Sequence, residues 1–181
     1  MKIVGAVEAI KCEEGVGNQT MAVEMRIQGL MIDPITNTPI VVLRDPLSDA
    51  KLPIWVGVFE ANAIALEMEK IRSPRPMTHD LLRDTLIRLG ARLQRVLIND
   101  LQDNTFYALL FLDTPQGPAE IDARPSDAIA LALRCDAPIF AHESVIRDAQ
   151  NIDLTQGHED AEKLRNWLEG LNDGELGKYE M

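Results

Sequence analysis

The tetrapeptide AIAL occurs at residues 63–66 and again at residues 128–131. Around both copies the apolar residues continue at helical spacing, and each copy follows a short segment with the pattern of a strand. Ala, Ile and Leu are common in helices, so chance can produce a four-letter match. The match becomes informative because the same order of predicted elements surrounds both copies.

Three strands and a helix are predicted around the first copy. Residues 21–29 alternate apolar and polar side chains, which is the period of a half-buried strand. Turn residues at 33–39 lead to further predicted strands at 40–43 and 52–56. Residues 59–71 carry apolar side chains at helical spacing, which predicts an amphipathic helix.

The same order returns around the second copy. Strands are predicted at 93–101, 105–112 and 119–123, followed by a helix from Ser126. The strand at 105–112 is apolar on both faces, which predicts a central place in the sheet with cover on both sides. The helix is apolar nearly all round and is expected to be buried, with alanines that let it lie close to the sheet.

Further elements link and follow the two units. A linking helix is predicted with Thr78 as its N-cap and Gly90 at its end. A last strand is predicted at 138–141, and residues 160–171 have the spacing of an amphipathic helix. The sequence therefore predicts an α+β fold, a mixed β-sheet with packed helices. We interpret it as a duplicated β-β-β-α unit with a C-terminal amphipathic helix.

The length bounds the domain organisation. A chain of 181 residues supports one well-buried core and shows no evident linker between two large domains. We expect an N-terminal extension with an edge strand at 1–20, one domain at 21–145, and an acidic helical tail at 146–181.

The composition indicates the cellular compartment and argues against two kinds of cysteine site. The chain lacks both a run of 18 apolar residues and a signal-peptide pattern, so we expect a cytoplasmic protein without membrane contact. Cys12 and Cys135 lie far apart without metal-site spacing, which predicts two reduced thiols and no zinc site or disulfide framework.

The charge is strongly asymmetric. The formal net charge is −11, which opposes binding to a polyanion. Residues 70–95 nevertheless hold seven of the 18 Lys and Arg residues against two Asp. Three interpretations stay open for this segment: a phosphate-binding patch, a surface for an acidic partner, or the solvated face of one helix.

The best-known catalytic motifs are absent from the sequence. It contains no Gly-rich phosphate loop, no G-x-S-x-G elbow and no H-E-x-x-H helix, and we expect no organic cofactor. What remains is a set of polar residues where predicted strands meet helices: Glu60, Arg75, Thr78, His79, Asp80, Asp122, Arg124, Ser126 and Asp127. Helix N-termini favour anions such as phosphate, and an Arg there adds a bidentate phosphate contact.

Ordinary structural roles compete with chemistry at these junctions. Thr78 and Ser126 are sufficient as helix N-caps, and a carboxylate in a first turn, such as that of Asp127, offsets the helix dipole. Asp122 and Arg124 stand two apart on one face of a strand, where they are candidates for a buried ion pair.

Four ordered blocks of the sequence resemble the bifunctional nuclease family. The blocks are LPIWVG at 52–57 with EA at 60–61 and AIA at 63–65, RPMTHDLL at 75–82, DL at 100–101 with TFYA at 105–108, and IDARPSDAIALA at 121–132. The resemblance spans about residues 21–145. It implies a compact α+β domain, a nuclease that cleaves RNA and DNA, and a homo-oligomer, for which we expect a dimer.

Two classes of function, catalytic and non-catalytic, follow from these observations. The first is a metal-assisted nuclease, with the following candidate roles: Glu60, His79, Asp122 and Asp127 as catalytic residues; Glu60, Asp122 and Asp127 as ligands of Mg²⁺ or Mn²⁺; and Arg75 and Arg124 as phosphate-binding residues. In this model His79 acts as general acid or base. The second is a non-catalytic regulatory or scaffold domain that binds a protein partner or an anionic ligand, including a nucleotide sensor.

Overall fold

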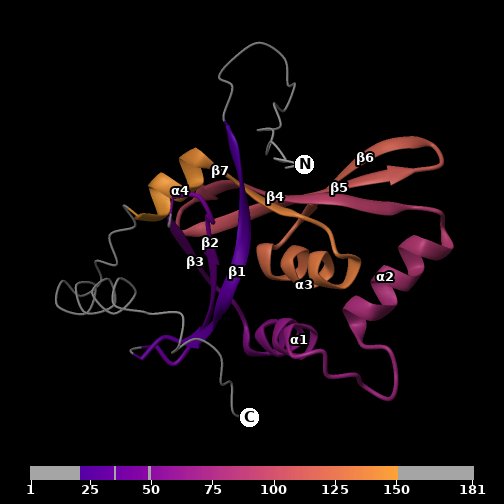
Figure 1. Ribbon diagram of the computed structural model, residues 1–181, viewed down its shortest axis with the longest axis horizontal. Coiled ribbons are helices and arrows are strands. Elements are labelled where there is room, and N and C mark those ends of the chain that lie inside the picture. The colour runs from indigo at the N-terminus through magenta and orange to yellow at the C-terminus, as the bar shows by residue number, and fades with distance from the viewer. Residues whose placement is uncertain (1–20, 35, 49, 151–181) are drawn as a thin grey trace, which may run out of the picture.

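The chain folds as an α+β domain. The computed structural model describes residues 21–34, 36–48 and 50–150, which contain seven strands and four helices (Figure 1). In chain order they are β1 (Ala22–Ile32), β2 (Pro39–Arg44), β3 (Lys51–Trp55), α1 (Val58–Met68), α2 (Thr78–Arg88), β4 (Arg92–Gln102), β5 (Thr105–Thr114), β6 (Gly117–Ala123), α3 (Pro125–Cys135), β7 (Ile139–His142) and α4 (Glu143–Gln150). Every strand and helix predicted within these residues is present.

The sheet joins two antiparallel meanders through a short central strand. Its order is β3-β2-β1-β7-β4-β5-β6. β7 pairs antiparallel with β1, where Val23 lies opposite Ala141, and parallel with β4, where Val96 lies opposite Ile139. The sheet is therefore mixed, as predicted, and β7 makes one sheet out of two halves that are far apart in sequence.

Turn residues fix the hairpins. Asp103 and Asn104 both adopt positive φ, 47° and 59°, and form the two-residue connection between β4 and β5. Both central residues of a type I′ hairpin turn need positive φ, which Asn and Asp tolerate better than most residues. Between β1 and β2, the buried Asp33 accepts hydrogen bonds from the Thr36 hydroxyl (2.7 Å) and the Trp55 indole N–H (3.1 Å).

The expectation that the strand at 105–112 is central and covered on both faces is wrong. β5 is second from the edge, next to β6, and its burial alternates. Ala108, Leu110 and Leu112 are buried, whereas the other face carries Phe111, with the Arg95 guanidinium 4.1 Å from the centroid of its ring. Cation–π contact lets an apolar ring remain half-exposed on this face, so the apolar sequence indicated more burial than occurs.

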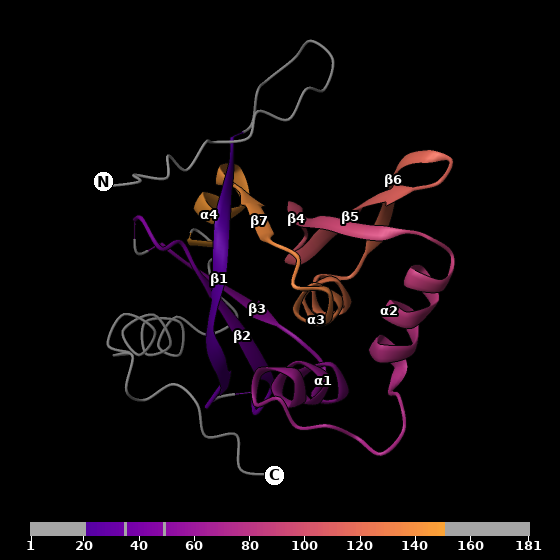
Figure 2. The same cartoon turned by 45° about the vertical axis from the view of Figure 1, so that its right-hand side comes forward.

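Helices α1 and α3 carry the two AIAL segments into one core. Ile64 and Ile129, the Ile of each copy, are both fully buried in the same cluster. The two helices contact each other, and α2 contacts α3. Figure 2 shows α1 and α3 within the bend of the sheet, with α2 beyond α3. Residues 128–132 of α3 have no exposed surface, which confirms the predicted burial.

Two predicted N-caps are wrong. The N-cap of α2 is Met77 rather than Thr78, and its backbone N–H donates to Asp80 Oδ2 at 2.9 Å. The N-cap of α3 is Arg124 rather than Ser126, because Pro125 is well suited to the first helical position. The predicted end of α2 is confirmed, since Gly90 follows its C-cap with a φ of +74°.

Helix α4 was not predicted from the sequence. It follows β7 directly, contacts both β3 and β4, and buries Val145, Ile146 and Ala149 in the main core. It therefore crosses the predicted boundary between domain and tail at 145. The predicted edge strand within 1–20 and the predicted helix at 160–171 lie outside the described residues.

The structure also bears on three further expectations, which concern duplication, the cysteines and membrane contact. Each half contains three antiparallel strands followed by a helix, although duplication of one unit stays a prediction. Cys135 is a half-buried free thiol, and burial raises its pKa. Among the described helices, none combines the length and the apolar character needed to span a bilayer.

A matched pair of Ile substitutions tests this account of the core. Ile129→Ala in α3 removes a fully buried side chain and is expected to lower the free energy of unfolding by about 2–5 kcal/mol. Ile87→Ala in α2 removes a side chain that is 64% exposed and should change it by no more than about 0.5 kcal/mol. Urea unfolding measures both. Equal effects of the two substitutions would contradict the assignment of α3 to the core.

Candidate functional site

Three helices present their first turns to one another. Glu60 lies in the first turn of α1, His79 in the first turn of α2, and Asp127 in the first turn of α3. Arg124 is the N-cap residue of α3, in extended conformation at the end of the β6 connection. The site is therefore built where backbone N–H groups of helices lack intrahelical partners and the helix dipole is positive.

Four side chains form one connected network across these turns. Arg124 Nη2 lies 3.0 Å from Glu60 Oε1, and Arg124 Nε donates to Asp127 Oδ2 at 2.7 Å. The other oxygen of Asp127, Oδ1, lies 3.1 Å from His79 Nε2. Arg124 thus joins α1 to α3, and Asp127 joins α3 to α2.

Burial differs along this network. The side chain of His79 is only 12% exposed, whereas that of Arg124 is 66% exposed. Burial would raise the pKa of Asp127, but hydrogen bonds from Arg124 and His79 outweigh it and lower that pKa below its usual value. Asp127 is therefore a carboxylate that can only accept hydrogen bonds, so the contact requires His79 to carry a proton on Nε2.

This arrangement leaves two groups available for chemistry. Nη1 of Arg124 takes part in neither of its two ion pairs, so an exposed guanidinium face remains for an anionic ligand. Nδ1 of His79 takes no part in the contact with Asp127. A carboxylate that orients the imidazole of a proton-transferring His is a recurrent catalytic arrangement. The site can therefore bind a phosphate oxygen and move a proton nearby.

The structure brings together some of the residues predicted from sequence. Glu60, His79, Arg124 and Asp127 converge, as described above. Asp122 is exposed on β6, and Arg75 is exposed in the segment between α1 and α2. Within the described residues, neither belongs to this network. The predicted buried ion pair between Asp122 and Arg124 is wrong, because both are exposed and Arg124 pairs with Glu60 and Asp127 instead.

The predicted metal ligands do not fit a metal centre in this arrangement. Glu60 and Asp127 are held apart by the guanidinium of Arg124, which pairs with both. Across the described ranges, no group of three His, Cys, Asp or Glu side chains is placed to hold an ion.

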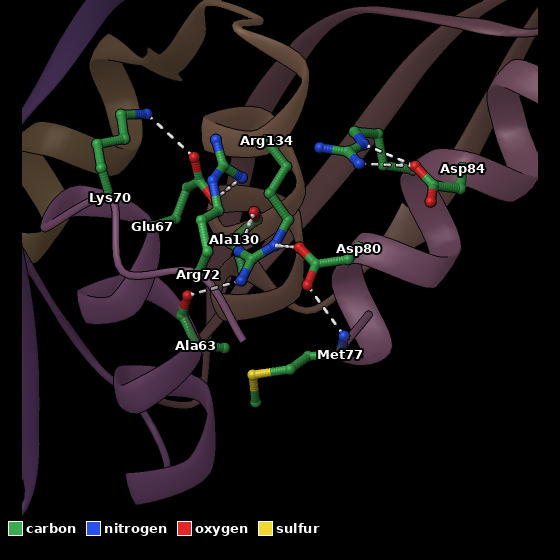
Figure 3. A network of polar contacts seen from close by, with 10 residues as sticks. Ala63, Glu67, Lys70, Arg72, Met77, Asp80, Asp84, Ala130 and Arg134 are labelled. Atoms are coloured by element: carbon green, nitrogen blue, oxygen red, sulfur yellow. Dashed lines mark hydrogen bonds and ion pairs between the residues drawn. The ribbon is translucent and has the colours of Figure 1, made fainter. Parts of the chain in front are cut away.

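A second polar cluster, which sequence reasoning missed, lies where α1, α2 and α3 meet around Arg134 (Figure 3). The side chain of Arg134 is only 2% exposed, and its Nε donates to Asp80 Oδ1 at 2.7 Å. Its Nη1 donates to Ala130 O at 2.9 Å and its Nη2 to Ala63 O at 3.0 Å. The available signal was one Arg inside the otherwise apolar stretch of α3.

A cavity of about 180 Å³ opens beside this second cluster. Its walls come from the end of α1, the connection to α2, α2 itself and Arg134; they are Leu66, Glu67, Ile71, Arg72, Ser73, Pro74, Pro76, Met77, Asp80, Arg83, Asp84 and Arg134. The buried Glu67 pairs with Lys70 (3.0 Å) and lies 3.7 Å from Arg72. None of the four network residues lines this cavity, so it is separate from the candidate site.

Four of the seven cations in the basic segment at 70–95 make local contacts. Lys70 and Arg72 contact Glu67, and Arg83 contacts Asp84 at 2.7 Å. Arg95 lies over the ring of Phe111. These contacts favour the interpretation of a solvated, internally paired surface over that of a continuous phosphate-binding patch.

The lowered pKa of Asp127 predicts an acid-dependent loss of stability. Its carboxylate is favoured in the folded state, so this contribution is present above the unfolded pKa of about 3.9 and is lost as the pH falls through the folded value. Asp127→Asn should therefore flatten the fall in free energy of unfolding below about pH 4, by less than about 1 kcal/mol because the side chain is 32% exposed.

The measurement is urea unfolding between pH 2.5 and 6, repeated in 1 M NaCl, where screening should reduce the difference between the two proteins. Identical pH dependence in wild type and Asp127→Asn at low salt would contradict the lowered pKa.

Comparison with known proteins shows which domain family the chain resembles. A model of the bifunctional nuclease domain matches residues 41–153, which include all four residues of the network. An uncharacterized protein of Mycobacterium tuberculosis is 39% identical over 158 residues, covering 82% of this chain and 94% of the relative.

Plant relatives share the same domain at lower identity. Bifunctional nuclease 1 of Oryza sativa subsp. indica is 28% identical over 116 residues, which are 62% of this chain and 35% of that protein. Bifunctional nuclease 2 of Oryza sativa subsp. japonica is 29% identical over 133 residues, which are 71% of this chain and 41% of that protein. The domain match covers more than half of the chain. The chain belongs to the bifunctional nuclease domain family.

Proposed function

We propose that this chain is a nuclease that hydrolyses phosphodiester bonds of RNA and DNA at the network of Glu60, His79, Arg124 and Asp127. The observation that carries the proposal is the convergence of an oriented imidazole and an exposed guanidinium at three helix N-termini. The names of the plant relatives supply the reaction class.

The proposed reaction divides two tasks between His79 and Arg124. The free Nη1 of Arg124 binds a non-bridging phosphate oxygen and offsets the charge that develops there. Attack by water forms a new P–O bond and breaks the bond to the leaving oxygen. One proton must leave the attacking water, and one must reach the leaving oxygen. Nδ1 of neutral His79 takes the first proton while solvent water protonates the leaving oxygen, or the protonated ring donates the second while solvent water accepts the first.

Asp127 and Glu60 support these two groups. Asp127 fixes the tautomer and direction of the imidazole, and together with Glu60 it holds the guanidinium of Arg124. The four side chains have no net charge when His79 is protonated and a charge of −1 when it is neutral. Protonation of His79 therefore favours phosphate binding. Cleavage assays with Mg²⁺, with Mn²⁺ and with a chelator determine whether a divalent ion that binds together with the substrate is required.

Matched substitutions separate the network from its neighbours. His79→Ala, Arg124→Ala and Asp127→Ala should each lower the cleavage rate of single-stranded RNA and DNA by about 100-fold or more, since general acid–base catalysis contributes about 10²–10⁴-fold. Asp122→Ala and Arg75→Ala, which remove the same residue types outside the network, should retain more than half of the wild-type rate.

The assay uses protein freed of contaminating nucleases, with Mg²⁺, with Mn²⁺ and with EDTA. Circular dichroism controls for folding of each variant. Cleavage at the wild-type rate in both His79→Ala and Arg124→Ala would contradict this assignment of the active site. Loss of activity in Asp122→Ala, with His79→Ala fully active, would move the chemistry onto β6.

Gly57 offers a test of Glu60 that leaves its carboxylate intact. A Cβ at Gly57 would collide with Oε2 of Glu60, because this side chain folds back over the helix N-terminus. Gly57→Ala should displace the carboxylate from Arg124, lower cleavage by several fold, and change the free energy of unfolding by less than about 1 kcal/mol. Glu60→Gln is the companion variant. Full activity in both would remove Glu60 from the proposal.

A specific observation favours a second, non-catalytic function. In α2 no side chain is buried, and Leu81, Leu82 and Ile87 are exposed, together with Leu89 beyond its end. Such a surface fits a scaffold domain that binds a protein partner or a second copy of this chain, the homodimer expected from sequence. Absence of turnover in contaminant-free protein, with a dimer in sedimentation measurements, would favour this function over the nuclease.

A further inference from the structure

The position of α2 depends on few apolar contacts. It contains no buried side chain, and only Leu86 packs partly against the main core. Its first turn carries His79, whose ring must stay within hydrogen-bond distance of Asp127 on α3. Hydrophobic burial contributes little to the position of this helix. The position of His79 therefore depends more strongly on the polar contacts that α2 makes.

Arg134 supplies the most deeply buried of these contacts (Figure 3). Its guanidinium is bonded to three different elements: Ala63 O in α1, Ala130 O in its own helix and the Asp80 carboxylate in α2. A buried charge is tolerated only when it is paired and hydrogen-bonded, so this planar fork restricts where Asp80 can lie.

Asp80 transmits this restriction to the first turn of α2. Its Oδ1 accepts from Arg134 Nε, while its Oδ2 accepts from the backbone N–H of Met77. One carboxylate thus closes the helix N-terminus and also ties it to α3. His79 lies between Met77 and Asp80 in sequence, inside the turn that these bonds close.

We propose that Arg134 and Asp80 are positioning residues that hold the imidazole of His79 against Asp127. Neither touches the four-residue network, so both act through the backbone of the first turn of α2. The inference rests on the proposed nuclease function for its catalytic consequence, but the placement of His79 can be measured without it.

Arg83 provides a matched control. It lines the same cavity as Arg134 and lies on α2 itself, but its hydrogen bonds go to the adjacent residue Asp84. Arg83→Met therefore removes a guanidinium from the wall of the same cavity, and with it a charge near Asp80, but removes no hydrogen bond between α2 and α3. It should leave both the placement of His79 and cleavage unchanged.

The experiment measures acylation of His79 by diethyl pyrocarbonate in the full chain, with mass spectrometry of the peptides and His142 on β7 as internal reference. The principal variant is the double substitution Asp80→Asn with Arg134→Met. Removing both partners avoids an unpaired buried charge, so the fold should persist. Arg134→Lys, which keeps the charge but cannot reproduce the three-way contact, is the second variant.

The expected result is several-fold faster acylation of His79 in both variants, with His142 unchanged. Cleavage and its pH profile are measured on the same samples, and cleavage should fall by as much as about 100-fold, the scale of a misplaced catalytic group. Arg83→Met should match wild type in every measurement.

Wild-type acylation of His79 in the folded double variant and in Arg134→Lys would overturn the inference. If the double variant does not fold, unchanged acylation in Arg134→Lys alone overturns it. Faster acylation of His79 in the two variants, in an experiment where the wild-type protein itself shows no cleavage, would support the placement and contradict the nuclease proposal, so the two failures are distinguishable.

Discussion

A guanidinium buried among apolar side chains must satisfy its hydrogen bonds inside the protein, and in this chain Arg134 does so by joining three helices. Its contact with Ala63 O ties it to the first AIAL segment, and its contact with Ala130 O to the second. Its ion pair with Asp80 brings in α2, which has little hydrophobic attachment of its own. These contacts link the three helices whose first turns form the candidate site.

A second guanidinium, that of Arg124, lies at the surface of the same helices and differs from Arg134 in its exposure and its pairing. It is mostly exposed and holds two carboxylates, so it gives structure to the site while keeping donors free. An acidic chain with a net charge of −11 offers little long-range attraction for nucleic acid. The proposed recognition of nucleic acid therefore relies on short-range contacts to the phosphate, from Arg124 and from helix N-termini, rather than on a broad basic surface.

Local patterns made most of the fold predictable. Alternation in β1, the Asp103-Asn104 turn and the buried face of α3 are each encoded within about ten residues, which is why sequence reasoning found them. The partners of β7 could not be predicted, because a four-residue strand has many compatible neighbours and only tertiary packing selects β1 and β4. The same holds for α4, whose short apolar face is meaningful only beside β3 and β4.

The candidate site, like the fold, has features that local sequence predicts and features that it does not. The junction residues Glu60, His79, Arg124 and Asp127 could be predicted from their positions at the starts of helices, but which carboxylate pairs with which cation could not. Arg124 lies two residues from Asp122 along a strand, yet it turns to Asp127 one helical turn ahead and to Glu60 far away in sequence. Pairing of this kind depends on how three helices meet, and no local pattern contains that information.

We propose that these helix N-termini bind the phosphodiester that the protein cleaves. The most direct measurement is a crystal structure with a short phosphorothioate oligonucleotide that resists hydrolysis. We expect a phosphate bound by Arg124 Nη1, with the scissile phosphorus beside the imidazole of His79. An oligonucleotide bound on another surface, with Arg124 still paired only to Glu60 and Asp127, would contradict it.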